Sequence, residues 1–256
     1  MNTEKNEFVL INLNTYHPTT NENLASKIKI SADDVKKKYP NYENIMGIVI
    51  NEAVAGKDGK YIEALETAFE NKFTAIPANI DYIKHKKTLL TVILIKNKIN
   101  YEIIPLKWVL PNRVVAVKLD IPGKNKPLIL LGVYNVQTQV FPKKAAATYI
   151  MKRYLQKEEM WSEIINFIKT YNNPCLIIGD LQEPSIGLHM EILKSKYNFY
   201  EKNPGFPSVI NPEFLESNID HAMMNTQNDY RLIATGIDTG LIGTVSDHAM
   251  LTASIV

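Results

Sequence analysis

The chain has few features of a secreted or membrane protein. Only one of its 256 residues is a cysteine, Cys175, so no disulfide can form within the chain. Cys175 lies in an apolar run, where we expect a small buried side chain. The first residues, MNTEKNEF, lack the apolar segment of a secretory signal. No stretch approaches the roughly 18 apolar residues of a membrane span. We therefore expect a cytoplasmic protein with no transmembrane segment.

Motifs of several common ligand sites are also missing. The sequence contains no GxxxxGK[ST] and no GxGxxG, which argues against nucleotide handling by a phosphate-binding loop. It contains no HxxxH and no CxxC, so its residues suit zinc poorly. Lys and Arg number 29 and Asp and Glu 27, which leaves a net charge of +2. A polyanionic partner would therefore have to bind to local patches of basic residues.

What the chain does have is enough apolar sequence for a sizeable core. Hydrophobic residues make up 45% of it, and at this length they can build one large domain. No internal repeat, low-complexity tract or clear linker divides the sequence. We therefore expect residues 1–256 to form a single domain, and we expect a monomer.

Short apolar runs bounded by Pro, Gly, Asn or Lys predict about ten strands. These runs cover residues 7–13, 44–50, 72–78, 88–95, 101–106, 113–121, 127–134, 175–179, 217–224, 230–237 and 249–256. The sequence DIPGKNKP lies between two of them and is typical of the turn of an antiparallel hairpin. Residues 203–214, NPGFPSVINPEF, look irregular.

Helical spacing of apolar residues occurs in three places, at 59–71, 143–171 and 187–196. We expect a break in the longest of these helices near Glu158. Residues 24–39 are rich in lysine and suggest a loop with an exposed helix. Several of the predicted strands do not alternate between apolar and polar residues, so both of their faces should be buried. The pattern predicts an α+β fold, a four-layer α/β/β/α sandwich of two mostly antiparallel sheets with helices outside.

Polar or acidic residues follow strand after strand. They are Asn14, Glu52, Tyr134, Asp180 with Gln182, Asp220, and Asp247 with His248. In a sandwich these residues would converge at one rim. Carboxylate and amide oxygens suit Mg²⁺, and a carboxylate can orient or deprotonate an attacking water. Amide, tyrosine and histidinium groups can donate hydrogen bonds to phosphate oxygens. This set of groups favours hydrolysis of a phosphate ester.

Six short motifs in order, spread over nearly the whole chain, resemble those of one superfamily. They are INLNTYH, GIVINEAVAG, LLGVYNVQTQ, CLIIGDLQEP, SNIDHAMM and TVSDHAML. They are similar to segments of the endonuclease/exonuclease/phosphatase superfamily, which includes exonuclease III, abasic-site endonucleases and pancreatic-type deoxyribonuclease. The helix with Trp161 that precedes CLIIGDLQEP is also similar to the family's helix at that place.

The resemblance implies a metal site. Glu52 would be the principal ligand of Mg²⁺ or Mn²⁺, with Asn14 and Asp247 nearby. Asn51 stands where the family usually has Gln. The metal ion is thus expected as a cofactor.

The resemblance also implies catalytic roles. Asp180 would position or activate the attacking water, and Gln182, in the place of the family's Asn, would contact the scissile phosphate. His248, oriented by Asp220, would stabilise the negative charge on the phosphate. Tyr134 would contact the phosphate or assist the leaving group.

Three functions remain open at this point. The first is a metal-dependent phosphodiesterase that cuts DNA, favoured by the chain's size and by short basic runs such as residues 84–87. The second is a phosphatase or phosphodiesterase for lipids or other small phosphate esters, favoured by the nearly neutral net charge. The third is a binding module with the same fold and weakened catalysis, for which Asn51 and Gln182 would be symptoms.

Overall fold

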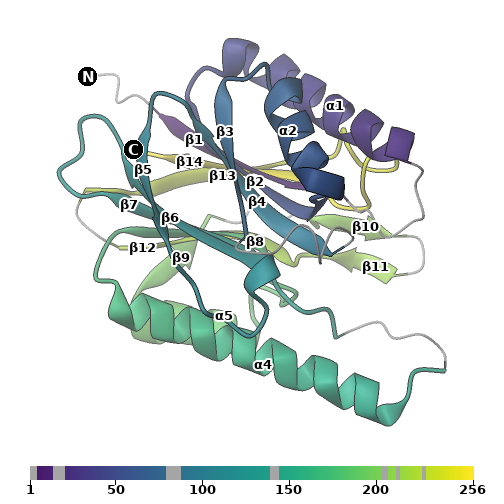
Figure 1. The fold of residues 1–256 in the computed structure, drawn as a ribbon. Coiled ribbons are helices and arrows are strands. Elements are labelled where there is room, and N and C mark those ends of the chain that lie inside the picture. Colours follow the sequence, from purple (N-terminus) through teal and green to yellow (C-terminus); the bar gives the residue numbers. More distant parts are fainter. Residues whose placement is uncertain are drawn as a thin grey trace.

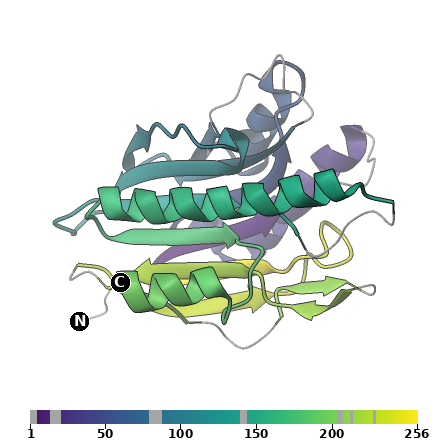
Figure 2. The same ribbon diagram turned by 90° about the horizontal axis from the view of Figure 1, so that it is seen from below.

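Two six-stranded β-sheets lie face to face at the centre of the molecule, with helices on the outer side of each (Figures 1 and 2). This computed structural model describes residues 5–13, 21–78, 88–138, 144–202, 207–211, 214–226 and 229–256. The first sheet has the strand order β13-β14-β1-β2-β4-β3 and the second the order β5-β6-β7-β8-β12-β9.

The first sheet consists of β1 (Asn6–Asn12), β2 (Ile45–Val54), β3 (Phe73–Pro77), β4 (Leu89–Lys96), β13 (Leu232–Asp238) and β14 (Met250–Ile255). The second consists of β5 (Asn100–Ile104), β6 (Val114–Asp120), β7 (Leu128–Tyr134), β8 (Cys175–Asp180), β9 (Phe199–Glu201) and β12 (Asp220–Asn225). A separate pair, β10 (Val209–Asn211) and β11 (Phe214–Ser217), forms a small antiparallel ladder.

Each sheet contains one parallel pair among otherwise antiparallel strands. The pairs are β1 with β2, and β7 with β8. A parallel connection needs a crossover, and α1 (Asn21–Lys38) and α4 (Ala147–Thr170) lie in these two crossovers. Both strands of each pair therefore end at the same edge of their sheet, which is the edge where the polar residues follow.

Three apolar layers hold the sandwich together. The outer layers lie between α1, α2 (Lys60–Ala68) and the first sheet, and between α4, α5 (Leu188–Tyr197) and the second sheet. The third lies between the two sheets. Ile48 and Val49 of β2 show why apolar runs do not alternate, since Ile48 packs in an outer layer and Val49 between the sheets. The predicted four-layer α/β/β/α sandwich is confirmed.

The structure also corrects three details of the sequence-based prediction. The helix expected to break near Glu158 continues through it as α4, because neither Gly nor Pro interrupts it. Residues 24–39, expected to be a loop with an exposed helix, are helical as far as Lys38, in the 18-residue helix α1. Its apolar side chains Leu24, Ile28 and Val35 share one buried face. Residues 203–214, expected to be irregular, include β10 and the first residue of β11.

The hairpin predicted at DIPGKNKP is confirmed, because β6 and β7 are antiparallel neighbours joined by this turn. Of the helices that the structure describes, none has both the length and the apolar character needed to cross a membrane. The basic run at residues 84–87 lies outside the described residues.

Candidate active site

The ends of β7 and β8 and the start of β12 place three polar side chains in a row. Tyr134 is paired with Asp180, and Asp180 is paired with Asp220. Residues paired across neighbouring strands project from the same face of a sheet. All three are buried, with Asp180 completely inaccessible to solvent. Tyrosine and two carboxylates thus share a water-poor edge on the side of the second sheet that faces the first.

The first sheet contributes Asn12 and His248 to the same place. His248 precedes β14, and its Nδ1 lies 2.8 Å from Oδ2 of Asp220. Asn12, the last residue of β1, donates from Nδ2 to Oδ1 of Asp220 at 3.0 Å, and this nitrogen is 3.2 Å from His248 Nδ1. Both carboxylate oxygens of Asp220 are therefore occupied by groups from the opposite sheet.

Gln182 folds back onto Asp180 at the end of β8. Its backbone N–H donates to Oδ1 of Asp180 at 3.0 Å, and its side-chain Nε2 donates to Oδ2 at 2.7 Å. Gln182 adopts the left-handed conformation, with φ of 53°, which is uncommon for a residue other than glycine. The side chain of Gln182, which is one methylene longer than that of Asn, thus contacts Asp180.

A bulge in β2 redirects Glu52 toward this cluster. The pairing of β2 with β4 shifts register between Ile50 and Ala53, and Glu52 has a positive φ of 56°. Bulges of this kind re-aim side chains and often occur beside functional sites. The carboxylate of Glu52 is buried and shares a hydrogen bond with the Tyr134 hydroxyl, so Glu52 and Tyr134 join the two sheets at the rim.

Asn51, next to Glu52, spans the two sheets. Its Nδ2 donates to the carbonyl of Val133 in β7 at 3.0 Å, and its Oδ1 accepts from Thr91 of β4 at 3.2 Å. Asn51 is fully buried. In this structure Asn51 holds the sheets together behind the cluster.

Three residues at the site were not predicted from the sequence. Asn12 is described above. Arg113, just before β6, donates to the carbonyl of Asn135 at 2.8 Å, and its guanidinium lies 4.2 Å from the centre of the Tyr134 ring. Lys27 of α1 is buried, its Nζ lies 3.4 Å from the carbonyl of Leu13, and it interacts electrostatically with Glu52 and Asp247.

The pair β10–β11 borders the site beside His248. Val209 of β10 forms an isolated bridge with His248, and the carbonyl of Ser208 accepts the N–H of Ala249 at 2.7 Å. The Ser208 hydroxyl also accepts the N–H of Asp220 at 3.1 Å. In Figures 1 and 2 this pair lies at the end of the molecule opposite the two chain ends.

Burial and neighbouring charges shift the pKa values of the titratable groups in the cluster. Burial raises the pKa of Asp180 to about 7, and the nearby carboxylate of Asp220 adds to the rise. Burial alone would lower the pKa of His248, but attraction to Asp220 outweighs it and raises this pKa to about 10. Burial also raises the pKa of Glu52. The site thus pairs a histidinium with a carboxyl group whose pKa lies near neutral pH.

The donor atoms suit a hard divalent cation. Oδ1 of Asn12 and Oε1 of Gln182 are buried, and neither accepts a hydrogen bond from the described residues. Such oxygens are typical ligands of Mg²⁺. Ligand atoms of Asp180, Asp220 and His248 also lie within 4.8 Å of one another. Asp180 already accepts a hydrogen bond from Gln182, and Asp220 already contacts His248. His248 would also have to lose its proton to bind a metal ion, so the corner around Glu52 is the better fit.

The remaining predicted residues are placed as follows. Asp247 is half-buried at the edge of the cluster, with Oδ1 at 3.9 Å from Nε2 of His248. Asn14 lies outside the described residues. Glu52, Tyr134, Asp180, Gln182, Asp220 and His248 all gather at the rim. His221, next to Asp220, points the other way, with Nδ1 at 2.9 Å from Glu201.

Solved structures show the same architecture. The chain matches D. rerio TDP2 complexed with single-strand DNA product at a TM-score of 0.68 and 10% identity, covering 99% of this chain and 100% of that one. It matches the endonuclease/exonuclease/phosphatase from Bacteroides vulgatus at 0.68 and 12%, covering 99% of each chain. For the family protein from Leptotrichia buccalis C-1013-b the values are 0.65 and 13%, with 98% and 99% covered. No family model and no curated protein matches the sequence.

Proposed function

We propose that this chain, which has the fold of the endonuclease/exonuclease/phosphatase superfamily, is a divalent-metal-dependent phosphodiesterase whose substrate is DNA. In this proposal residues 1–256 act as a single domain, as a monomer and in the cytoplasm. The observation that carries the proposal is the buried contact between Asp220 and His248 directly beside Asp180. A histidinium and a partly deprotonated carboxyl group at one rim are the groups that phosphodiester hydrolysis needs.

In this proposal the metal ion binds beside Glu52. Glu52 and Asp247 supply carboxylate oxygens, and Asn12 supplies its amide oxygen, which accepts no hydrogen bond from the described part of the chain. Asn14 remains a predicted ligand. When bound, the metal ion would neutralise charge on the phosphate and help the leaving oxygen depart.

Asp180 is proposed to receive the proton of the attacking water. Each of its oxygens already accepts one hydrogen bond from Gln182, and a carboxylate oxygen has a second lone pair for the water. The Gln182 amide has a second N–H, which we propose donates to a phosphate oxygen.

His248 is proposed to donate to the phosphate as negative charge develops. Its Nδ1 faces Asp220, so Nε2 is the nitrogen that can donate to the substrate. Asp220 would hold the ring in this orientation and keep it protonated. Tyr134 is proposed to contact the phosphate or the leaving group.

DNA is the favoured substrate for two reasons. The D. rerio TDP2 structure of the same fold was solved with a single-strand DNA product. The sequence also resembles nucleases in the Tyr134 segment. The test uses chelator-treated protein, Mg²⁺ or Mn²⁺, and end-labelled single-stranded and duplex oligonucleotides.

The matched variants for this assay are Glu52→Gln and Glu102→Gln. Glu102 lies on β5, and its side chain is 69% exposed. We expect cleavage by the native protein and by Glu102→Gln, and at least a hundredfold loss in Glu52→Gln. If neither ion supports cleavage of DNA or of bis(p-nitrophenyl) phosphate at micromolar enzyme, the proposed function is wrong.

A second candidate function is hydrolysis of lipid or other small phosphate esters. The net charge of +2 favours it, since it provides little general attraction for a long polyanion. Release of phosphate or alcohol from a small ester, with DNA left intact under the same conditions, would select this candidate. Binding of DNA without cleavage of any ester would instead select a binding module with weakened catalysis.

A further inference from the structure

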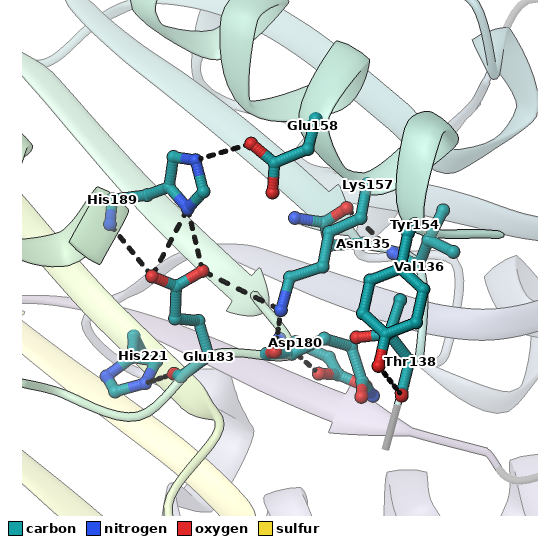
Figure 3. A network of polar contacts seen from close by, with 11 residues as sticks. Asn135, Val136, Thr138, Tyr154, Lys157, Glu158, Asp180, Glu183, His189 and His221 are labelled. Carbon is teal, nitrogen blue, oxygen red and sulfur yellow. Dashed lines mark hydrogen bonds and ion pairs between the residues drawn. The ribbon is translucent and has the colours of Figure 1, made fainter. Parts of the chain in front are cut away.

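A network of charged side chains, buried except at Glu158, lies behind Asp180 and holds the segment that joins β8 to α5. Figure 3 shows it reaching from α4 to α5. Lys157 of α4 donates from Nζ to the carbonyl of Gln182 at 2.7 Å, and the same nitrogen is 3.7 Å from Oε2 of Glu183. The side chains of Lys157 and Glu183 are only 13% and 8% exposed, so water weakens these contacts little.

Glu183 also contacts His189 in α5. Its Oε1 accepts the backbone N–H of His189 at 2.8 Å, and its Oε2 lies 2.9 Å from Nδ1 of the ring. The ring stacks on Trp161 of α4 with centres 4.9 Å apart, and its Nε2 is 3.2 Å from Glu158 of α4. The network therefore fixes α4, α5 and the segment between β8 and α5 to one another.

Gln182 is the residue that this network holds most directly. A positive φ costs a residue with a side chain about 1–3 kcal/mol and persists only where the surroundings enforce it. Three atoms of Gln182 are held. Asp180 accepts from its backbone N and from Nε2, and Lys157 donates to its carbonyl oxygen. Of these contacts, the one made by Lys157 comes from outside the turn itself.

The same face of α4 also fastens the stretch that follows Tyr134. Arg153 donates to the carbonyl of Gln137 at 3.2 Å. The Tyr154 hydroxyl donates to the carbonyl of Thr138 at 3.3 Å (Figure 3). One helix thus holds the segments beyond two neighbouring strand ends. Lys157 differs from the other two in being nearly buried and in touching the turn that contains Asp180.

We propose that Lys157 is a positioning residue for the proposed hydrolysis. It holds the Gln182 carbonyl so that the side-chain amide stays on Asp180 with its second N–H directed toward the phosphate. Lys157 contacts neither the phosphate nor the attacking water in this scheme. The catalytic part of this inference rests on the proposed function, whereas the structural part, the position of the Gln182 amide, does not.

The first test compares Lys157→Met with Lys157→Arg. Lys157→Met removes the donor and is expected to lower kcat by up to about tenfold, no more than loss of the Gln182 amide itself, with KM changed less than twofold. Lys157→Arg keeps a charged donor and is expected to recover at least a third of the native kcat. Lys152→Met, a change of the same type at an exposed lysine of α4, is the control and should leave both constants within twofold.

A second measurement works whether or not the protein is an enzyme. The side-chain NH₂ of Gln182, assigned by NMR, is expected to exchange slowly with solvent in the native protein and at least tenfold faster in Lys157→Met. If Lys157→Met does not fold, Lys157→Gln takes its place with the same expectation.

These outcomes separate the two proposals. A native kcat in Lys157→Met together with unchanged exchange at Gln182 would overturn the positioning role. Faster exchange at Gln182 in a protein with no phosphodiesterase activity would support the structural part and refute the proposed function. A loss of activity that Lys157→Arg does not recover, with Gln182 exchange unchanged, would also refute the positioning role.

Discussion

Nδ1 of His248 lies 2.8 Å from Oδ2 of Asp220, although Asp220 begins β12 of the second sheet and His248, 28 positions later, precedes β14 of the first. Both are buried, and Asn12 occupies the second oxygen of the same carboxylate. This contact fixes which ring nitrogen faces outward and raises the affinity of the ring for a proton. Substitutions that break this contact are therefore the most direct test of the proposed chemistry.

Replacing Asp220 should therefore change both the rate and its pH dependence. Asp220→Asn removes the charge that raises the pKa of His248 to about 10, so this pKa should fall toward 6.5. We expect kcat at pH 8 to drop about 10²- to 10⁴-fold, with the alkaline limb of the profile moved to lower pH. Asp120→Asn, at the exposed end of β6, should leave the profile unchanged. An Asp220→Asn profile that coincides with the native one would contradict the role assigned to this pair.

Asp180 should titrate near neutral pH. Burial raises the pKa of this carboxyl group from 3.8 to about 7, so the base is deprotonated only as the pH rises through that value. In metal-free protein, the ¹³C shift of the Asp180 carboxyl group should show a midpoint near 7. Because the folded pKa exceeds the unfolded one, this group favours folding below pH 3.8 and loses that contribution as the pH rises through about 7. A midpoint below 5 would be incompatible with this environment.

Gln182 can be tested with two substitutions of different length. Gln182→Ala removes a donor from the Asp180 carboxylate, so the pKa of Asp180 should rise further and kcat should fall about tenfold. Gln182→Asn introduces the residue found in the motif that this segment resembles, and it should retain or improve turnover. If both variants behave like the native protein in kcat and in the titration of Asp180, the Gln182 amide has no part in catalysis.

Glu201 offers a test of stability away from the rim. It accepts a hydrogen bond from His221 and contacts Ser185 and Lys194. Burial would raise its pKa, but these partners lower it from 4.5 to about 2. The stabilisation is thus present above pH 4.5 and is lost as the pH falls through about 2. After a discount for solvent screening, we expect Glu201→Gln to lower the free energy of unfolding at pH 7 by about 2 kcal/mol.

Urea unfolding at two pH values checks this. At pH 3 the difference between native protein and Glu201→Gln should shrink, because the unfolded chain has then taken up a proton at residue 201. Glu102→Gln, whose side chain is exposed on β5, should stay within about 0.5 kcal/mol of native at both values. If the difference in the free energy of unfolding between the two proteins is the same at pH 7 and pH 3, the charge of Glu201 is not its source.

The sequence predicted the rim well where a polar residue interrupts an apolar strand. Asp180 and Glu52 follow long apolar runs. Because the apolar runs form strands of two packed sheets, the polar residues at their ends lie at one edge. Asn12 escaped notice because it lies inside its run, with Asn14 the more obvious end. Its importance comes from a contact with Asp220, 208 residues away, which no local pattern contains.

The sequence also did not predict that Lys27 and Lys157 lie at the site, for a different reason. Lys27 belongs to a lysine-rich helix whose other basic residues are largely exposed, and Lys157 lies between charged and polar neighbours on α4. In both cases the lysine is covered by a segment distant in the sequence, which carries Leu13 in the first case and Gln182 in the second. The bulge that turns Glu52 inward is likewise a product of pairing with β4, and nothing in residues 51–52 distinguishes a bulge from the end of a strand.

The order of the strands has a practical consequence for cutting the chain in two. The turn at Gly123 between β6 and β7 is exposed, and a side chain added there would meet no neighbour. A break at this point leaves Asn12, Asn51 and Glu52 on one fragment. Asp180 and His248 remain on the other. Neither half contains a complete rim, so we expect the proposed phosphodiesterase turnover only on reassembly. The molecule could then serve as a split reporter whose signal depends on the two fragments being brought together.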